Sequence, residues 1–199
     1  MKLGFLKAAM LSSLIFSATA ARANDQCQIL DAAHTNDYEA LTFFLKKGDF
    51  DWSGEASCGI KNDVELGCKV FRGDVDAQTT HMMLAQGLTV NRYCSVWKAG
   101  RETLATSPLK TAVLSYNFDA ARVLISKGAD VNKLYRKLYI SEYLVLSGCD
   151  SGAKEREAAE GIKLLIENGA SSAHISKTYE RALERKCSIL RAELKPYLK

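Results

Sequence analysis

The sequence predicts an all-α fold of about four helix–turn–helix repeats followed by a C-terminal capping helix. Four apolar runs with helical periodicity each end in a glycine, and these glycines are 39, 41 and 41 residues apart: Gly48, Gly87, Gly128 and Gly169. A glycine at this place suits a left-handed helix C-cap, because glycine takes positive φ without strain. A shorter helical pattern precedes each run. A fixed period of this length indicates stacked supersecondary units that share a core.

The elements follow in chain order. We expect short first helices at residues 27–36, 66–72, 107–116 and 138–147, with Pro108 in the first turn of the third, where its missing N–H costs nothing. The repeats then span about 26–55, 64–94, 105–135 and 138–172, with a cap over 175–195. Extra residues are expected as loops at Asp49–Val64 and Thr89–Thr106, and as an insertion at Gly148–Arg156. A single charged helix, Lys177–Leu194, is expected to close the open end.

Residues 1–23 have the organisation of a secretory signal peptide. Lys2 and Lys7 precede a short apolar stretch, and Ala21-Arg22-Ala23 has the small-x-small form of a cleavage site. Cleavage would leave residues 24–199 as one domain in the periplasm or outside the cell. It would also lower the net charge from +4 to about +1. Such a chain has no electrostatic basis for binding nucleic acid, and no other run is long enough to span a membrane.

One unit is nearly complete as a family motif. Ser107-Pro108-Leu109-Lys110-Thr111-Ala112 and then Gly128-Ala129-Asp130-Val131-Asn132 resemble the T-P-L-H-x-A and G-A-D-V-N segments of an ankyrin repeat. The resemblance covers roughly residues 26–192, and it is strong in this unit, fair in two others and loose in the second. The period here is about 40 residues instead of the family's 33 or so. The resemblance implies an ankyrin-repeat domain that binds other proteins through loop tips and the concave first-helix face.

All six cysteines follow the predicted cleavage site, and an even count in an oxidising compartment favours disulfides. Equivalent positions in neighbouring ankyrin-like repeats imply a Cys149–Cys187 bridge, although both could instead be buried thiols. The same reasoning suggests Cys58–Cys94 and Cys27–Cys68, with a local Cys58–Cys68 bridge as the competitor.

Aromatic and basic side chains near the long loops are the candidates for protein binding, since Trp, Tyr and Arg dominate interface energetics. The alternative is that the loops fold back and bury their aromatic side chains on a neighbouring repeat. The candidates are Trp52, Arg92, Tyr93, Trp97, Tyr135 and Arg136.

The sequence offers no catalytic site and no cofactor motif. It lacks a nucleophile elbow, a P-loop, a zinc-protease helix and a dinucleotide-binding glycine set. His34, His81 and His174 are scattered over different units, so neither a metal site nor catalysis is expected of them.

The sequence therefore favours an exported, monomeric module that binds another protein, as an adaptor or an inhibitor. An immunity-type protein that neutralises a toxic effector is one such role. The alternatives are a periplasmic maintenance factor that supports a client enzyme under stress, and a hydrolase whose site is assembled from loops.

Overall fold

The computed structural model describes residues 25–48, 50–54, 58, 63–98 and 101–198, so the predicted signal peptide lies outside the described residues. Most of the described chain is helical, which confirms the all-α prediction at the level of fold class. A small three-stranded sheet is an addition that the sequence did not predict.

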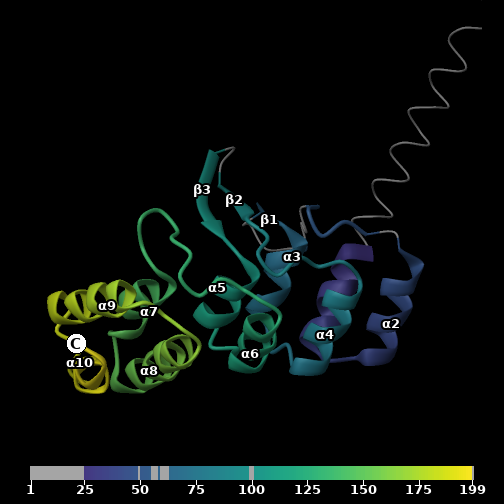
Figure 1. The fold of residues 1–199 in the computed structure, drawn as a ribbon. Coiled ribbons are helices and arrows are strands. Elements are labelled where there is room, and N and C mark those ends of the chain that lie inside the picture. Colours follow the sequence, from purple (N-terminus) through teal and green to yellow (C-terminus); the bar gives the residue numbers. More distant parts are fainter. Residues whose placement is uncertain (1–24, 49, 55–57, 59–62, 99–100, 199) are drawn as a thin grey trace, which may run out of the picture.

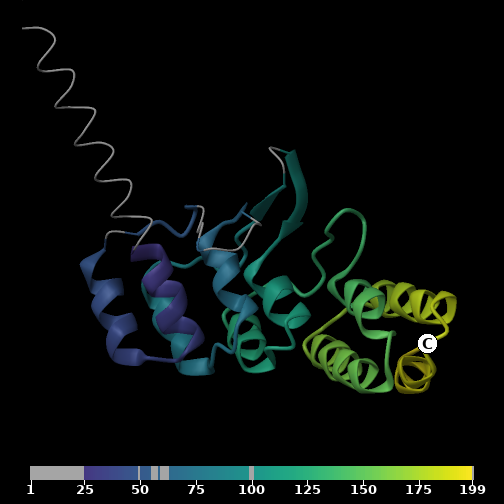
Figure 2. The ribbon, with the colours of Figure 1, turned by 180° about the vertical axis from the view of Figure 1, so that it is seen from behind.

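The helices form two layers, and successive pairs lie side by side along the molecule (Figure 1; Figure 2 from behind). The first layer contains the helix of residues 25–34, α3 (Leu66–Lys69) with the 3₁₀ turn η1 (Val70–Arg72), α5 (Pro108–Leu114), α7 (Ile140–Gly148) and α9 (Ser172–Glu184). The second contains α2 (Tyr38–Lys47), α4 (Ala77–Ala85), α6 (Phe118–Ser126), α8 (Gly152–Glu167) and α10 (Ser188–Leu194), which is followed by η2 (Lys195–Tyr197). Helices α5, α7 and α9 pack on their pair partners α6, α8 and α10. From α3 and α2 onward, each helix also packs on the next helix of its own layer.

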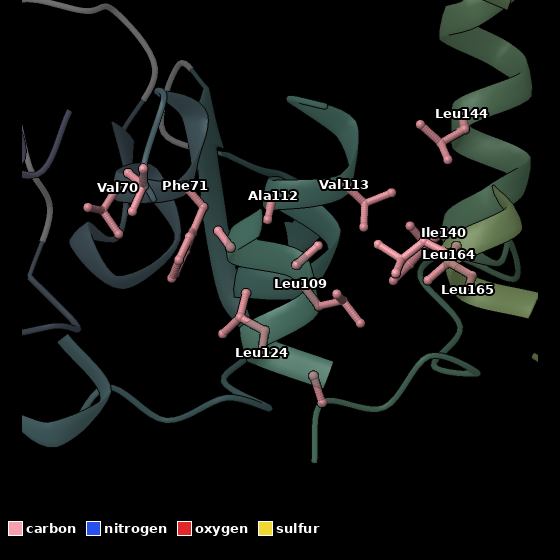
Figure 3. Packing of buried hydrophobic residues seen from close by; sticks show 14 of the residues in the cluster. Val70, Phe71, Leu109, Ala112, Val113, Leu124, Ile140, Leu144, Leu164 and Leu165 are labelled. Carbon is pink, nitrogen blue, oxygen red and sulfur yellow. The ribbon is translucent and has the colours of Figure 1, made fainter. Parts of the chain in front are cut away.

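The core runs continuously through both layers. Figure 3 shows Phe71 of η1 facing the α5 side chains, with Leu144 of α7 and Leu165 of α8 farther along the same cluster. These side chains are fully buried, and so is Ala112 of α5, a small residue that keeps neighbouring helices close. Because each pair covers its apolar face with the next one, the stability of one pair depends on its neighbours.

Polar side chains fix where the helices begin. Asp37, Asp76, Ser107, Asn117 and Ser171 each precede a helix and accept a hydrogen bond from an amide in its first turn. These bonds satisfy donors that have no partner inside the helix.

The turn between first and second helix has the same backbone in three pairs. Asn36, Tyr116 and Lys186 all have positive φ, at 52°, 58° and 60°. In each pair the amide of the next residue donates to the carbonyl five residues earlier, at 2.9 to 3.0 Å. The prediction of one continuous helix over Lys177–Leu194 is therefore wrong, because the chain turns at Lys186 and forms α9 and α10. The C-terminal end is itself a helix pair.

Asparagine side chains connect successive units on the loop side. Asn91 Nδ2 donates to the Gly128 carbonyl at 2.8 Å, and Asn91 Oδ1 accepts from the Asp130 amide at 2.9 Å. Asn132, 41 residues later, donates to the Gly169 carbonyl at 2.9 Å and accepts from the Ser171 amide at 2.8 Å. The same pair of bonds thus sets the spacing of two consecutive junctions.

Part of the segment expected as a loop at Thr89–Thr106 is a β-hairpin. Strands β2 (Cys94–Lys98) and β3 (Arg101–Thr106) pair antiparallel, and β1 (Asp63–Val64) pairs with β2, with Val64 opposite Val96. The hairpin projects from the stack on the same side as the loop before α7 (Figures 1 and 2). The Cys68–Cys94 disulfide joins its first residue to α3.

The six cysteines form Cys27–Cys58, Cys68–Cys94 and Cys149–Cys187. The Cys149–Cys187 bridge agrees with the prediction from equivalent positions. The suggested Cys58–Cys94 and Cys27–Cys68 bridges are wrong, and so is the local Cys58–Cys68 competitor. The reason is that the segment after α2 does not follow a regular repeat. Leu66 and Gly67 amides bond to the Gly54 and Trp52 carbonyls, which holds that segment beside the first two units.

The insertion predicted at Gly148–Arg156 is largely helical. Helix α7 ends at Gly148, and α8 begins at Gly152, so the extra residues lengthen α8 to 16 residues. A side chain at Gly148 would place its Cβ 2.6 Å from the Ala158 Cβ. A glycine is therefore needed at this close approach of α7 to α8.

We predict that Asn132→Ala lowers the free energy of unfolding by about 1–2 kcal/mol, because it removes two hydrogen bonds between units. Asn168→Ala is the matched control, since among the described residues the Asn168 side chain bonds to the Leu164 carbonyl of the preceding helix, α8, and to no other unit. Urea unfolding of the oxidised proteins measures both. An equal loss in the two variants would contradict a special role for the bonds between units.

Candidate functional site

The loop before α7 ends in a tight two-residue turn. The Tyr135 amide donates to the Leu138 carbonyl at 2.8 Å, and the Leu138 amide donates back to Tyr135 at 3.1 Å. Arg136 and Lys137 lie between them, with φ of 49° and 70°, and both side chains are exposed. Two central residues with positive φ are characteristic of a type I′ hairpin turn, which strongly prefers Asn-Gly. Here the turn presents two long cationic side chains instead.

Tyr135 anchors this turn to the first-helix layer. Its side chain is only 1% exposed, and its hydroxyl is hydrogen-bonded to Ser107, the residue that caps α5. Burial raises the pKa of the Tyr135 hydroxyl to about 12, so this group is neutral at every physiological pH. The Tyr143 hydroxyl donates to the Tyr135 carbonyl at 2.8 Å. Both α5 and α7 therefore position the turn.

The Lys110 ammonium lies beneath the turn between two aromatic rings. Its Nζ is 3.5 Å from the Tyr143 ring centroid and 4.7 Å from that of Tyr135, which are cation–π distances. Burial and, second to it, the nearby positive charge of Arg136 together lower the pKa of Lys110 to about 8. The aromatic rings thus stabilise a buried cation that faces a second cation at the surface.

Tyr93 and Lys133 form the outer rim of the same region. The Tyr93 ring is nearly parallel to that of Tyr135, at an interplanar angle of 8° and a centroid distance of 6.3 Å, and half of the residue is exposed. Lys133 Nζ lies 5.1 Å from the Tyr93 centroid and 3.4 Å from the Asn91 carbonyl. We call Tyr93, Lys110, Lys133, Tyr135, Arg136, Lys137 and Tyr143 together the tyrosine–cation surface.

The six predicted binding residues have different locations. Tyr93, Tyr135 and Arg136 come together in the tyrosine–cation surface, although Tyr135 supports it from inside. Trp52 belongs to the core, where it packs against Phe50, and its indole N–H donates to the Gln86 carbonyl. Arg92 is partly buried and is paired with Glu65, with Nε and Oε2 2.9 Å apart. Trp97 lies in β2, but its side chain is outside the described residues.

Four members of the surface were not predicted: Lys110, Lys133, Lys137 and Tyr143. Lys110 occupies the histidine position of the T-P-L-H-x-A motif, which places it in the first turn of a first helix. The place of Lys110 in this motif is the sequence feature from which its location could have been predicted. Lys137 is at the centre of the turn and Lys133 shortly precedes it. The turn has no glycine or asparagine at its centre, so its composition gave no indication of where its tip lies.

Ser141, His174 and Asn132 form a hydrogen-bonded chain that could not be seen in the sequence. Ser141 Oγ bonds to His174 Nε2, and His174 Nδ1 lies 3.3 Å from Asn132 Oδ1. Nucleophilic catalysis uses such an order of hydroxyl, imidazole and orienting group. Here Ser141 and His174 are each 1% exposed, and Ser141 also bonds to Thr178, so a substrate cannot reach the hydroxyl. The chain joins α7, α9 and the loop between units.

The His174 ring is held neutral. It stacks on Tyr139, with centroids 4.2 Å apart, and burial lowers the pKa of His174 to about 4. A protonated ring would lack solvation in this position.

Two grooves flank the stack. An acidic groove of about 360 Å³ lies near the helix–helix turns and is lined by Asp74, Asp76, Asp119, Glu160 and Arg122, among others. A groove of about 220 Å³ lies beside Lys137 and is lined by Lys177 and Arg181 together with Glu142, Glu180 and Glu184. Within the described ranges, no three His, Cys, Asp or Glu side chains are grouped so as to hold a metal ion.

No helix in the described part of the chain is both long and apolar enough to cross a membrane. No protein-family model matches this sequence, and a search of curated proteins finds no match.

We predict that His174 makes the fold sensitive to acid. In the unfolded chain the His174 ring takes up a proton near pH 6.5, whereas in the folded protein it does so only near pH 4. The contribution of the neutral ring to the free energy of unfolding is therefore fully present above about pH 6.5 and is lost as the pH falls toward 4. From pH 7 to pH 5 the loss should be about 1–2 kcal/mol. Urea unfolding should show this component in the wild type and not in His174→Gln. The exposed His81→Gln is the control, and an unchanged pH slope in His174→Gln would refute the assignment.

We also predict that replacing Arg136-Lys137 by Asn-Gly raises the free energy of unfolding by about 1 kcal/mol, because both positions have positive φ. Thermal unfolding measures the change. Arg136→Ala with Lys137→Ala is the matched control, since it removes both charges and keeps the backbone strain. Equal gains in the two variants would show that charge repulsion, and not the backbone, is the cause.

Proposed function

We propose that this chain is an exported ankyrin-repeat module that binds another protein through its tyrosine–cation surface. The observation that carries the proposal is the repeated bonding of Asn91 and Asn132 to the glycine of the following unit. The residue type, both bonding partners and the positive φ of Gly128 and Gly169 recur after 41 residues. A repeat architecture accounts for that recurrence most simply.

The helix–helix turns support the same architecture. Three pairs turn through a residue of positive φ and repeat one backbone hydrogen bond, and the unit from Ser107 to Asn132 carries the ankyrin-like motif. In such a stack the first helices and the loops before them share one side, which is where Tyr93, Lys110 and Arg136 meet.

Export is proposed from the N-terminal segment and the cysteines. Residues 1–23 read as a signal peptide, and the six cysteines pair into three disulfides. Disulfides persist in the periplasm and outside cells. We therefore propose a periplasmic or secreted protein that works as an adaptor or inhibitor, with an immunity-type role as one form.

A binding role fits the character of the tyrosine–cation surface. Tyr93 is half exposed and lies beside Lys133, and Leu134 is 47% exposed. Tyrosine and arginine supply large contact areas and directional hydrogen bonds at protein interfaces. The Ser141–His174 chain does not favour the hydrolase alternative, because both groups are covered by protein.

An affinity capture of the oxidised, exported protein from a periplasmic extract tests this function. We expect one stoichiometric partner, retained about tenfold less by Tyr93→Ala, because Tyr93 is the half-exposed aromatic ring on the rim of the surface. Phe43→Ala is the matched control, since Phe43 is an exposed aromatic residue on α2, in the other layer. A partner lost with Phe43→Ala alone would move the site to the second layer. No partner at any salt concentration would refute the binding role.

A further inference from the structure

We propose that the Arg136–Lys137 turn is the docking point for a carboxylate-rich segment of the partner protein, which it contacts together with Lys133 and Tyr93. This inference rests on the proposed binding function and specifies the chemistry of the partner. Three observations support it: the backbone of the turn, the balance of charges around it, and the apolar side chains beside it.

The backbone of the turn disfavours these two residue types. Both have positive φ, where a side chain with a Cβ is disfavoured and asparagine or glycine is preferred. Both side chains are exposed, so neither fills the core. A strained backbone that carries exposed functional groups is typical of binding sites. The turn therefore displays two cations at a cost in stability.

The charges around the turn are unbalanced on one flank. Lys133, Arg136 and Lys137 form no ion pair with any residue that the structure describes. Two of the nearby acids are engaged elsewhere: Glu142 with Arg181, and Asp130 with the Asn132 amide. A protein whose exported form has a net charge of about +1 thus gathers three cations within five residues.

The opposite flank sets the direction of approach. The groove beside Lys137 has balanced charge, because Lys177 and Arg181 lie among its glutamates, so it offers an acidic segment no net attraction. On the other flank lie Tyr93 and Lys133, with Lys110 below. Arg136 is close enough to Lys110 to disfavour its positive charge, and a carboxylate held at Arg136 would relieve that repulsion. An acidic segment would therefore lie across Tyr93 and Lys133 toward Arg136.

A protein segment fits this place better than a small anion. The three cations are spread over an open turn and do not enclose a pocket. Tyr93 and Leu134 add exposed aromatic and aliphatic area beside them. Arginine pairs with carboxylates through two parallel hydrogen bonds, and an extended chain could in addition cover the Tyr93 ring.

The test is fluorescence anisotropy with a labelled glutamate-rich peptide of about ten residues and its glutamine counterpart. We expect the oxidised, exported protein to prefer the glutamate peptide by about tenfold at low salt and to lose the preference at high salt. Arg136→Asn with Lys137→Gly should abolish the preference, and so should Arg136→Ala with Lys137→Ala. Because the Asn-Gly variant is expected to unfold at a higher temperature than the wild type, misfolding cannot account for its loss of binding.

Lys127→Ala with Lys154→Ala is the control, since it removes the same charge from exposed positions on the second layer. It should keep the preference. Equal binding of the two peptides, or a preference that survives in the Asn-Gly variant, would overturn the inference. Turn-dependent binding to anionic phosphatidylglycerol vesicles, without peptide binding, would also overturn it. If a partner is captured through Tyr93 and its retention is unchanged in the Asn-Gly variant, the proposed binding function holds and the docking inference is wrong. If no partner is captured, the proposed function and the docking inference are both wrong.

Discussion

The junction bonds of Asn91 and Asn132 are the constraint on which the placement of the remaining structure depends. One amide side chain both donates to a glycine carbonyl of the next unit and accepts from an amide two residues farther on. Two opposed bonds from one planar group fix distance and orientation together. Since Asn132 also contacts His174, the same side chain joins the loop to the buried chain of Ser141 and Thr178. The relative position of neighbouring units is thus set by these polar groups, and apolar side chains fill the space between the helices.

The tyrosine–cation surface follows from that register. Once α5 and α7 are adjacent, Ser107 and Tyr143 both reach Tyr135, whose backbone forms the turn. Lys110 is then covered by two tyrosine rings, which replace part of the solvation that burial removes. Tyr135 and Lys110 are buried, whereas Tyr93, Arg136 and Lys137 are exposed and contribute little to the core. The binding surface that we propose therefore has a buried base, and its exposed side chains can change with little effect on that base.

Much of the architecture could be predicted from local chemistry. The glycines that close the second helices, Pro108 in the first turn of α5, and Ala112 between helices all have a reason that operates within a few residues. The structural features that the sequence did not predict share another cause. Lys186 takes positive φ without being glycine, so the break between α9 and α10 left no mark in composition. The Cys27–Cys58 pairing and the β2–β3 hairpin depend on how long segments return to the stack, which a repeat period does not specify.

The candidate site was predictable only where residue type alone suffices. Tyr93 and Arg136 belong to types that are frequent at interfaces, whereas Trp52 belongs to the same class and serves the core. What separates them is burial in the fold: Trp52 is 7% exposed, whereas Tyr93 is 50% exposed and Arg136 lies at an exposed turn with positive φ. A sequence selected for stability alone would place asparagine and glycine there. Tyr116 and Lys186 show the same conflict at turns between helices, so positive φ supports the docking role that we propose for Arg136 and Lys137 only together with their exposure and their charge.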